Sequence, residues 1–307
     1  MILIGGNCRL VYPRCLFAIG QRRIRNFGLT AIRKLSSSKK TVDVETVGKV
    51  CLIAINRPEK KNAIDTATAH QLYRAFQDFE KNDRVGVAVL YGKGGNFCSG
   101  FDLGELADEF RNTCYSMPDM PSRSERAPMG PTRMSFTKPV IAAVSGYAVA
   151  GGLELALMCD IRVLEESAIM GVFNRRFGIP LIDGGTARLP QLIGLSRALD
   201  MILTGRPVDS KEALSFGLAN RVVPTGTAVG QATQLALSIS RFPQMCLQVD
   251  RASAYYSAYD AISMQDALQN ESFKAREVIR SESIKGAKKF ISGEGKHGSF
   301  DDFKDKM

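Results

Sequence analysis

Apolar and polar residues alternate along the chain with two different periods. Three short runs typical of strands lie at residues 44–47, 50–55 and 85–91, and the last two are almost wholly apolar. Between the second and third runs, apolar residues recur at helical spacing after Asp65 or Thr66, either of which can cap a helix. The pattern predicts two strands, a helix and a third strand in this part of the chain.

A second cycle of the same kind follows. Residues 139–144 predict a buried strand, and a glycine-rich turn at 146–152 leads into a short helix at 153–159. A strand is then expected at 160–164, with helices at 183–193 and 196–204. Strand, turn and helix recur without repeated sequence, which favours a coiled α/β core over a doubly wound sheet.

Strand patterns end near residue 229. Helices are expected at 231–240, 243–259 and 262–280, so we place the start of a helical C-terminal subdomain near residue 235. The predicted parts are a leader at 1–40, an α/β core at 41–235 and the helical subdomain at 236–307. Residues 111–133 hold four Pro and four Arg without an apolar period, which predicts a mobile loop that could cover a site.

Positive charge is concentrated in the leader. Residues 1–42 contain nine Lys or Arg and no Asp or Glu, so they supply nine of the ten net charges of the chain. Such a segment is typical of a mitochondrial transit peptide, which predicts a mature protein in the mitochondrial matrix. The alternative is a basic arm that contacts nucleic acid or an anionic membrane. The nearly neutral remainder has no basic stripe, which disfavours nucleic-acid binding.

Composition narrows the class of protein further. No apolar run approaches the roughly 18 to 20 residues of a membrane-spanning helix, so no membrane span is expected. The seven cysteines show no paired spacing, which is typical of free thiols. With only two histidines, neither a multi-histidine metal site nor a Ser-His-Asp triad is expected.

Two turns that contain glycine each lead from a strand into a helix. They are residues 96–102, Asn-Phe-Cys-Ser-Gly-Phe-Asp, and residues 146–154, Gly-Tyr-Ala-Val-Ala-Gly-Gly-Leu-Glu. Glycine lets the backbone approach a ligand closely, and a helix N-terminus offers unpaired N–H donors. Two such turns facing each other would aim two N–H groups at one oxygen and form an oxyanion hole. Taken singly, each motif is weak, since a Gly-Gly turn before a buried helix more often serves packing alone.

Together with further motifs, these turns resemble the crotonase (enoyl-CoA hydratase/isomerase) superfamily. The further motifs, in the order of the family, are residues 56–63, 138–142, 159–160, 184–189 and 203–206. The resemblance covers residues 44 to about 225 well and the helical tail loosely. It implies a fold of class α/β, a crotonase-like spiral of ββα turns with an α-helical C-terminal trimerisation domain. It also implies a homotrimer or a dimer of trimers.

The resemblance assigns roles to several residues. The backbone N–H groups of Phe101 and Gly151 would form the oxyanion hole, holding the thioester carbonyl of an acyl-CoA and stabilising an enolate. The implied CoA-binding residues are Arg57, Lys60, Lys61 and Ala63, with Phe290 from a neighbouring subunit. Coenzyme A is here part of the substrate, and no separate cofactor or metal is expected. Without the resemblance, the basic turn would be interpreted as solvated.

Glu154 lies where family hydratases carry one of two catalytic glutamates. Neighbouring leucines should desolvate this carboxylate and raise its pKa toward the range that suits acid–base catalysis. The second glutamate of the family, in a Phe-Gly-x-Pro-Glu pattern, is replaced here by Met-Gly-Val-Phe-Asn at residues 170–174. Asn174 can hold a water or a carbonyl by hydrogen bonds, but it cannot exchange a proton.

Asp183 lies near the place where some relatives carry an extra catalytic aspartate. The alternative is that it caps the following helix. Arg175 and Arg176, beside Asn174, could meet a carboxylate on the acyl group or could face solvent.

The catalytic candidates are therefore Glu154, Asp183 and Asn174, and the predicted activity is that of a lyase similar to an enoyl-CoA hydratase, in fatty acid or branched-chain acyl-CoA metabolism. One alternative is a one-carboxylate reaction through the same enolate, either decarboxylation of a malonyl-type CoA or double-bond isomerisation. A third alternative, of a different class, is a non-enzymatic relative that binds acyl-CoA or RNA.

Overall fold

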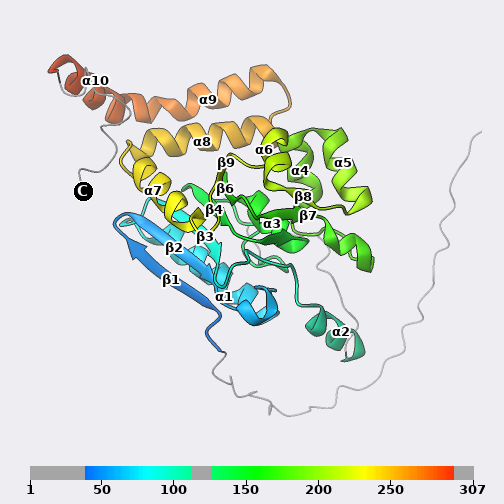
Figure 1. Ribbon diagram of the computed structural model, residues 1–307. Helices are drawn as coiled ribbons and strands as arrows, with labels where there is room; N and C mark the ends of the chain where they lie inside the picture. Colours follow the sequence, from blue (N-terminus) through cyan, green and yellow to red (C-terminus); the bar gives the residue numbers. More distant parts are fainter. Residues whose placement is uncertain (1–38, 113–125, 294–307) are drawn as a thin grey trace, which may run out of the picture. The chain divides into compact units, whose positions relative to one another are not determined.

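The computed structural model describes residues 39–112 and 126–293, except for the side chains of 108–112 (Figure 1). The predicted leader, apart from its last two residues, and residues 113–125 of the predicted mobile loop lie outside these ranges, whereas residues 111–112 of that loop end helix α2 (Leu103–Asn112). In the residues that the structure describes, no helix combines the length and the apolar character that a membrane crossing requires.

A six-stranded sheet forms the centre of the described chain. Its order is β1-β2-β3-β4-β6-β9, with β1 and β2 antiparallel and every later pair parallel. The strands are β1 (Val42–Val47), β2 (Val50–Ile55), β3 (Val87–Gly92), β4 (Val140–Val144), β6 (Ile161–Glu165) and β9 (Arg221–Val223). The predicted strands at 44–47, 50–55, 85–91, 139–144 and 160–164 are confirmed within three residues at each end.

Both faces of the central strands are buried, which explains their unbroken apolar runs. In β2, Ile53 and Ile55 pack in the main core together with Leu72 and Phe76 of α1 (Thr66–Lys81). Val50 and Leu52 of β2 lie in a second core, which α7 (Ala228–Ser240) covers. Asp65 caps α1 by accepting a hydrogen bond from the Thr68 N–H at 2.8 Å, as one of the two predicted caps.

A second sheet of three short strands was not predicted. It contains β5 (Tyr147–Val149), β7 (Ile169–Gly171) and β8 (Val208–Asp209), in the order β5-β7-β8. The chain passes from β4 to β5 and then into α3 (Gly151–Met158), so one strand of each sheet precedes a helix. This passage from sheet to sheet to helix is the ββα turn of the expected spiral, and the α/β fold class is confirmed.

Further helices in the described ranges are α2 (Leu103–Asn112), α4 (Gly185–Ile193), α5 (Leu195–Thr204), α6 (Ser210–Phe216), α8 (Gln244–Tyr259), α9 (Met264–Val278) and α10 (Ile284–Ile291). Helices α4, α5, α8 and α9 confirm those predicted at 183–193, 196–204, 243–259 and 262–280, whereas α6 and α10 were not predicted. The boundary expected near residue 235 falls inside α7, because Ala232 and Ala236 on either side of it both pack against the sheet. Helix α7 therefore belongs to the core by its packing, and the separate helical part begins with α8.

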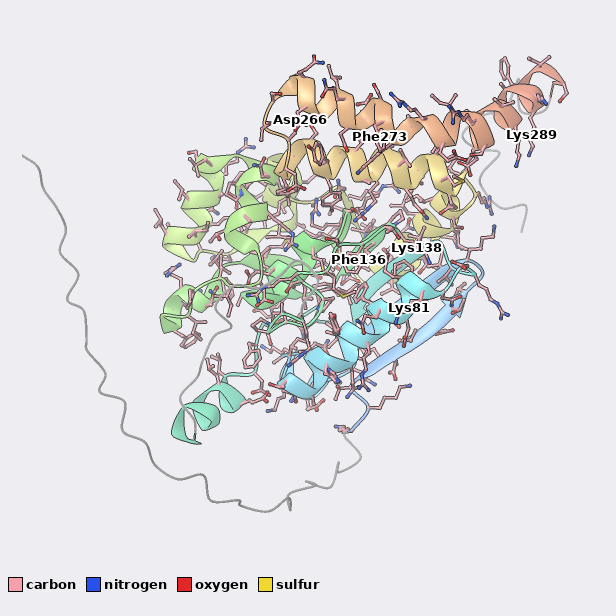
Figure 2. All side chains as sticks on the ribbon, turned by 180° about the vertical axis from the view of Figure 1, so that it is seen from behind. Lys81, Phe136, Lys138, Asp266, Phe273 and Lys289 are labelled. Atoms are coloured by element: carbon pink, nitrogen blue, oxygen red, sulfur yellow. The ribbon has the colours of Figure 1, made fainter. Side chains whose placement is uncertain are left out.

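Helices α8 and α9 lie side by side (Figure 1). Helix α8 is bound to the core at Asp160, whose Oδ1 accepts hydrogen bonds from Arg251 Nε at 2.9 Å and from the Tyr255 hydroxyl at 2.8 Å. Arg251 also donates to the carbonyl oxygen of Phe136, which lies below these helices in Figure 2. Because Asp160 directly precedes β6, these bonds join α8 to the central sheet.

Candidate active site

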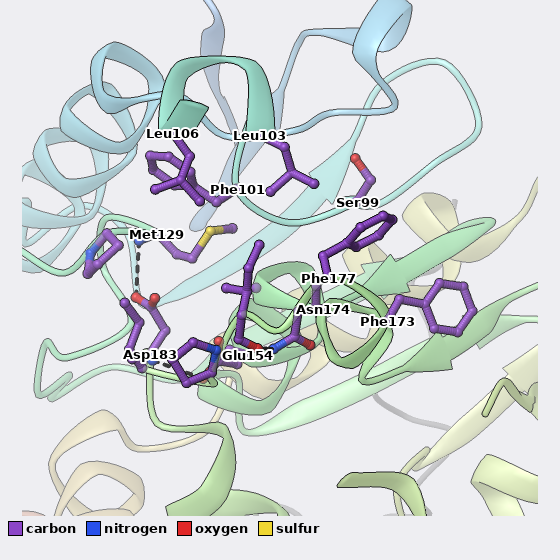
Figure 3. A pocket seen from close by; sticks show the side chains of 16 residues that line it. Ser99, Phe101, Leu103, Leu106, Met129, Glu154, Phe173, Asn174, Phe177 and Asp183 are labelled. Atoms are coloured by element: carbon purple, nitrogen blue, oxygen red, sulfur yellow. Dashed lines mark hydrogen bonds between the residues drawn. The ribbon is translucent and has the colours of Figure 1, made fainter. Parts of the chain in front are cut away.

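A cavity of about 150 Å³ opens between α2, α3 and the segment that precedes α4. Figure 3 shows Glu154, Asn174 and Asp183 on one wall, with Phe101, Leu103 and Leu106 opposite. The other lining residues are Ser99, Pro128, Met129, Ala150, Gly151, Phe173, Phe177, Ile179, Pro180 and Ile182. All five residues expected in the oxyanion hole and the acid–base group thus line one space.

The two glycine turns pack directly against each other. A parallel bridge pairs Cys98 with Ala148. A Cβ on Gly100 would lie 3.0 Å from Ala150 Cβ and 3.3 Å from Gly151 N, and one on Gly152 would lie 2.1 Å from the Cys98 carbonyl oxygen. Glycine is therefore required at this contact for its small size.

The N–H groups of Phe101 and Gly151 have no hydrogen-bond acceptor within the described residues. Both residues line the cavity, and Gly151 is the first residue of α3, where the helix dipole adds partial positive charge. Ala150, just before it, has φ 54° and ψ −125°, which a residue with a Cβ rarely adopts. Two N–H donors on facing turns that line one cavity agree with the expected oxyanion hole, which stays a prediction.

Glu154 is buried on the inner side of α3. One carboxylate oxygen, Oε1, accepts hydrogen bonds from the backbone N–H groups of Asp183 at 2.9 Å and Gly185 at 2.8 Å. Burial, and then the negative charge of Asp183, raises the pKa of Glu154 to about 7. The other oxygen accepts no hydrogen bond within the described residues. Glu154 is thus both held in place and able to gain or lose a proton near neutral pH.

Asp183 does not cap α4, so the capping alternative is wrong. The N-cap position belongs to Gly184, with φ 96° and no side-chain cap. The Asp183 Oδ1 instead accepts hydrogen bonds from the Met129 N–H at 3.0 Å and from the Thr132 hydroxyl at 2.5 Å. Burial raises the pKa of this carboxyl above its ordinary value. Its Oδ2 accepts no hydrogen bond within the described residues.

Residues 126–133, the described end of the predicted mobile loop, are packed into the protein. Ala127, Met129 and Thr132 are buried, and a Cβ on Gly151 would lie 2.5 Å from the Met129 sulfur. For these residues the mobile-loop prediction is wrong, because they form part of the site wall. Sequence reasoning missed Met129 and Thr132 as site residues, since a stretch rich in Pro and Arg gives no apolar period.

Asn174 has one satisfied and one unsatisfied side-chain atom. Its Nδ2 donates to the Ile179 carbonyl oxygen at 2.7 Å, whereas its buried Oδ1 has no hydrogen-bond partner in the part of the chain described. A buried acceptor without a donor points to a water or ligand group at that position. Of its neighbours, Arg175 Nε donates to the Ile202 carbonyl oxygen, and the exposed Arg176 stacks over the Phe173 ring at 4.4 Å.

Basic side chains of the expected CoA-binding turn form ion pairs with acidic residues of the same chain. Arg57 is buried, and its guanidinium forms ion pairs with Asp65 at 2.9 Å and Asp102 at 3.0 Å. It also donates to the Ala63 carbonyl oxygen, so direct contact with a ligand would require these bonds to break. The Arg57 side chain thus holds the turn together, and its expected contact with CoA stays a prediction.

The remaining CoA candidates are more accessible. Lys60 Nζ lies 2.7 Å from Asp102, and its side chain is 51% exposed. The exposed Lys61 lies over the Tyr147 ring, 5.0 Å from its centroid. Phe290, on α10, is exposed and does not line the cavity of its own chain. Its expected contact from a neighbouring subunit stays a prediction.

Comparison with known proteins places the chain among acyl-CoA enzymes. The family model described as enoyl-CoA hydratase/isomerase matches residues 45–296. The enoyl-CoA hydratase EchA19 of Mycobacterium tuberculosis is 31% identical over 260 residues, which cover 83% of this chain and 90% of the relative. A probable mitochondrial enoyl-CoA hydratase of Dictyostelium discoideum is 31% identical over 231 residues, 75% of this chain and 80% of that protein.

Further relatives and solved structures agree. The 2,3-dehydroadipyl-CoA hydratase of Escherichia coli K12 is 32% identical over 223 residues, 73% of this chain and 84% of that protein. The crystal structure of an enoyl-CoA hydratase from Mycobacterium tuberculosis H37Rv has a TM-score of 0.74 at 31% identity, covering 82% of this chain and 96% of that one. The resemblance to the crotonase superfamily is thereby confirmed, and the chain belongs to the enoyl-CoA hydratase/isomerase family as a member similar to the hydratases.

Proposed function

We propose that this protein is a hydro-lyase that adds water to the α,β double bond of an enoyl-CoA thioester, and removes it in reverse. One observation carries the proposal: three acceptor oxygens without a donor in the described residues, on Glu154, Asp183 and Asn174, belong to side chains that line one cavity. A water molecule has two hydrogens to donate, one for the Asp183 oxygen and one for the Asn174 oxygen, while the Glu154 oxygen would carry a proton of its own. Hydration uses that water as its second substrate.

The two glycine turns would act on the thioester. Its carbonyl oxygen accepts hydrogen bonds from the N–H groups of Phe101 and Gly151, which stabilise the negative charge as the α-carbon becomes enolate-like. Polarisation of the carbonyl draws electrons from the double bond and opens the β-carbon to attack. The apolar wall of Phe101, Leu103 and Leu106 would cover one side of the double bond and the carbons next to it.

The two carboxyl groups would then share the proton transfers. Because burial, and then the charge of Asp183, raises the pKa of Glu154 to about 7, part of the molecules carry a proton on Glu154 near neutral pH, and we take this protonated form as the one that reacts. As the water oxygen bonds to the β-carbon, Asp183 takes a proton from the water. Glu154 then gives its own proton to the α-carbon. Asn174 Oδ1 accepts a hydrogen bond from the second hydrogen of the water and holds the water in place. The number of protons on the pair is unchanged overall.

Isomerisation and decarboxylation fit this arrangement less well. Each needs one acid–base group and no water, so Asp183 and Asn174 would have no part in the chemistry. A site without catalysis would not need two buried carboxyl groups, since burying them costs free energy.

The function is tested by hydration of crotonyl-CoA, followed as the loss of the enoyl-thioester absorbance. We expect Glu154→Gln and Asp183→Asn each to lower kcat by about 10² to 10⁴, the usual contribution of a general acid or base. Glu166→Gln removes an exposed carboxylate outside the cavity and serves as the control. Wild-type rates in Asp183→Asn, with activity lost in Glu154→Gln, would favour a one-carboxylate reaction.

We further propose assembly as a homotrimer or a dimer of trimers through the C-terminal helices. Phe273 on α9 (Figure 2), Ile279 and Phe290 are between 56% and 69% exposed, which is unusual for large apolar side chains outside an interface.

We also propose a mitochondrial location. The proposal rests on the composition of residues 1–42 and on the relative in Dictyostelium discoideum that is named mitochondrial.

A further inference from the structure

A second, larger cavity lies directly behind the candidate active site. Its volume is about 620 Å³, and it is bounded by residues 132–136, α4 and the inner faces of α8 and α9. Ile182 lines both cavities, and Thr132, which lines the second, donates a hydrogen bond to Asp183, which lines the first, so the two spaces adjoin. Much of the lining is apolar or aromatic, including Met134, Phe136 and Tyr255. We call this space the rear chamber.

The charged side chains that line the rear chamber are mostly basic. Arg133, Arg188, Arg251 and Lys274 are opposed by one acid, Asp260. Arg251 is already bound to Asp160 at 2.9 Å. Arg188 is used by two backbone carbonyl oxygens, those of Asp183 at 3.0 Å and Thr132 at 2.6 Å. Arg251 and Arg188 therefore serve to hold the fold together, whereas Arg133 and Lys274 add further positive charge to the rear chamber.

Arg133 is placed where the two cavities meet. Its side chain is half-buried, and its Nη2 donates to the backbone carbonyl oxygen of Ile182 at 2.8 Å. It forms no ion pair with any residue in the described ranges, and no second hydrogen bond from its guanidinium to them is made. Four of its five N–H donors therefore have no acceptor among the described residues and could serve a ligand. Arg175 and Arg176, the cations considered from the sequence, do not line the rear chamber.

We propose that the rear chamber receives the far end of the acyl group, and that Arg133 selects acyl chains that end in a carboxylate. A chain that extends from the thioester past Ile182 meets the guanidinium that is bound to the carbonyl of that residue. A planar guanidinium with free donors binds a carboxylate through two parallel hydrogen bonds. Met134 and Phe136 would pack against the methylene groups. This inference deepens the proposed function and rests on it.

The test compares two acyl groups of six carbons that differ only at their far end. For trans-2-hexenedioyl-CoA and trans-2-hexenoyl-CoA, we expect the wild-type kcat/KM to favour the dicarboxylic substrate by about 10-fold or more, in line with a charge-assisted hydrogen-bonded pair. Arg133→Met should lower this ratio by about 10- to 100-fold. Arg133→Lys keeps the charge but loses the planar fork, so it should retain part of the preference.

Binding of the saturated pair, adipyl-CoA and hexanoyl-CoA, measured by calorimetry, makes the test independent of turnover. Arg197→Met is the matched control, because exposed Arg197 stacks on Phe216 and lines neither cavity. Two results would overturn the inference. One is a wild-type protein that binds and hydrates the carboxylate-ended and methyl-ended acyl-CoA equally well. The other is an Arg133→Met variant that binds both acyl-CoA compounds more weakly by the same factor. If the calorimetric preference is present but no enoyl-CoA is hydrated, the proposed function fails and the assignment of the rear chamber stands.

Discussion

At the scale of single residues, the two carboxyl groups of the site are held in place by one connected set of hydrogen bonds. The backbone N–H of Asp183 donates to Glu154, while the Asp183 side chain accepts from Thr132 and Met129. Arg188 bonds to the carbonyl oxygens of both Asp183 and Thr132 and closes the arrangement. Each carboxylate therefore presents its second oxygen from a position set by residues that are far apart in the sequence.

The raised pKa of Glu154 makes a prediction about stability. The folded protein holds this proton up to a pKa of about 7, whereas the ordinary value for Glu is 4.5. Between these pH values unfolding releases a proton, so the free energy of unfolding falls as the pH rises. A difference of about 2.5 pH units corresponds to roughly 3 kcal/mol.

Chemical denaturation at about pH 5 and pH 8 tests this point. From the lower to the higher pH, wild type should lose roughly 3 kcal/mol more of its free energy of unfolding than Glu154→Gln, which has no proton to release. Glu166→Gln, an exposed glutamate, should behave as wild type. Equal losses in wild type and Glu154→Gln would show that Glu154 is not desolvated as described.

At the scale of elements, local pattern sufficed where a segment carried enough apolar residues. The bounds of β2 and the Asp65 cap of α1 could be predicted because each depends on neighbouring residues only. The strands β5, β7 and β8 could not, since two or three residues carry no period. Their pairing joins segments separated by about twenty residues or more, which local pattern does not encode.

The site shows the same division. The family motifs pointed to Phe101, Gly151, Glu154, Asn174 and Asp183, and the structure gathers all five around one cavity. The motifs did not reveal Met129 or Thr132, because their link to Asp183 spans 51 residues or more and no regular element contains them. The side-chain partner of Asp183 was also misjudged: a helix cap was considered because the next helix begins two residues later.

The contact between the two glycine turns predicts a large difference between two similar substitutions. In Gly152→Ala the new Cβ would lie 2.1 Å from a backbone oxygen of Cys98, which can move only with its turn. We expect a loss of about 2 kcal/mol or more in the free energy of unfolding, together with loss of activity. In Gly230→Ala, within α7, nothing lies within 4 Å of the new Cβ.

The second substitution is the control. It should stabilise the protein by about 0.5 to 1 kcal/mol, since alanine favours a helix over glycine. Thermal and chemical denaturation of both variants, with turnover of crotonyl-CoA, would measure the difference. A tolerated alanine at residue 152 would mean that the two turns are not packed as tightly as the structure shows.

At the scale of the whole molecule, Asp160 is the connection between the core and the C-terminal helices. The side chains of Asp160 and Arg251 are 16% and 12% exposed, so this ion pair is largely shielded from water. Asp160→Ala leaves Arg251 without its carboxylate, and we expect a loss of about 3 kcal/mol in stability. We also expect weaker self-association, because α8 carries the adjoining α9 and α10.

Asp200→Ala provides the comparison. Its partner Arg206 also binds Glu212 at 2.7 Å, and both members of the Asp200–Arg206 pair are a third or more exposed in their side chains. Removal of Asp200 should therefore cost less than about 1 kcal/mol. Chemical denaturation and sedimentation of both variants provide the measurements. Equal losses in the free energy of unfolding would show that the Asp160–Arg251 pair contributes no more to stability than the exposed Asp200–Arg206 pair.

The second core has a consequence for the order in which the chain is made. Val50, Val87 and Ile141 lie on the sheet face that Ala228, Ala232 and Ala236 of α7 cover, and the sheet residues precede that helix by about 90 to 180 positions. A chain emerging from the ribosome thus carries an open apolar surface until residues near 240 are available to close it. Aggregation is expected to compete with folding during that interval, and a chain interrupted before Ala228 would remain permanently in the open state.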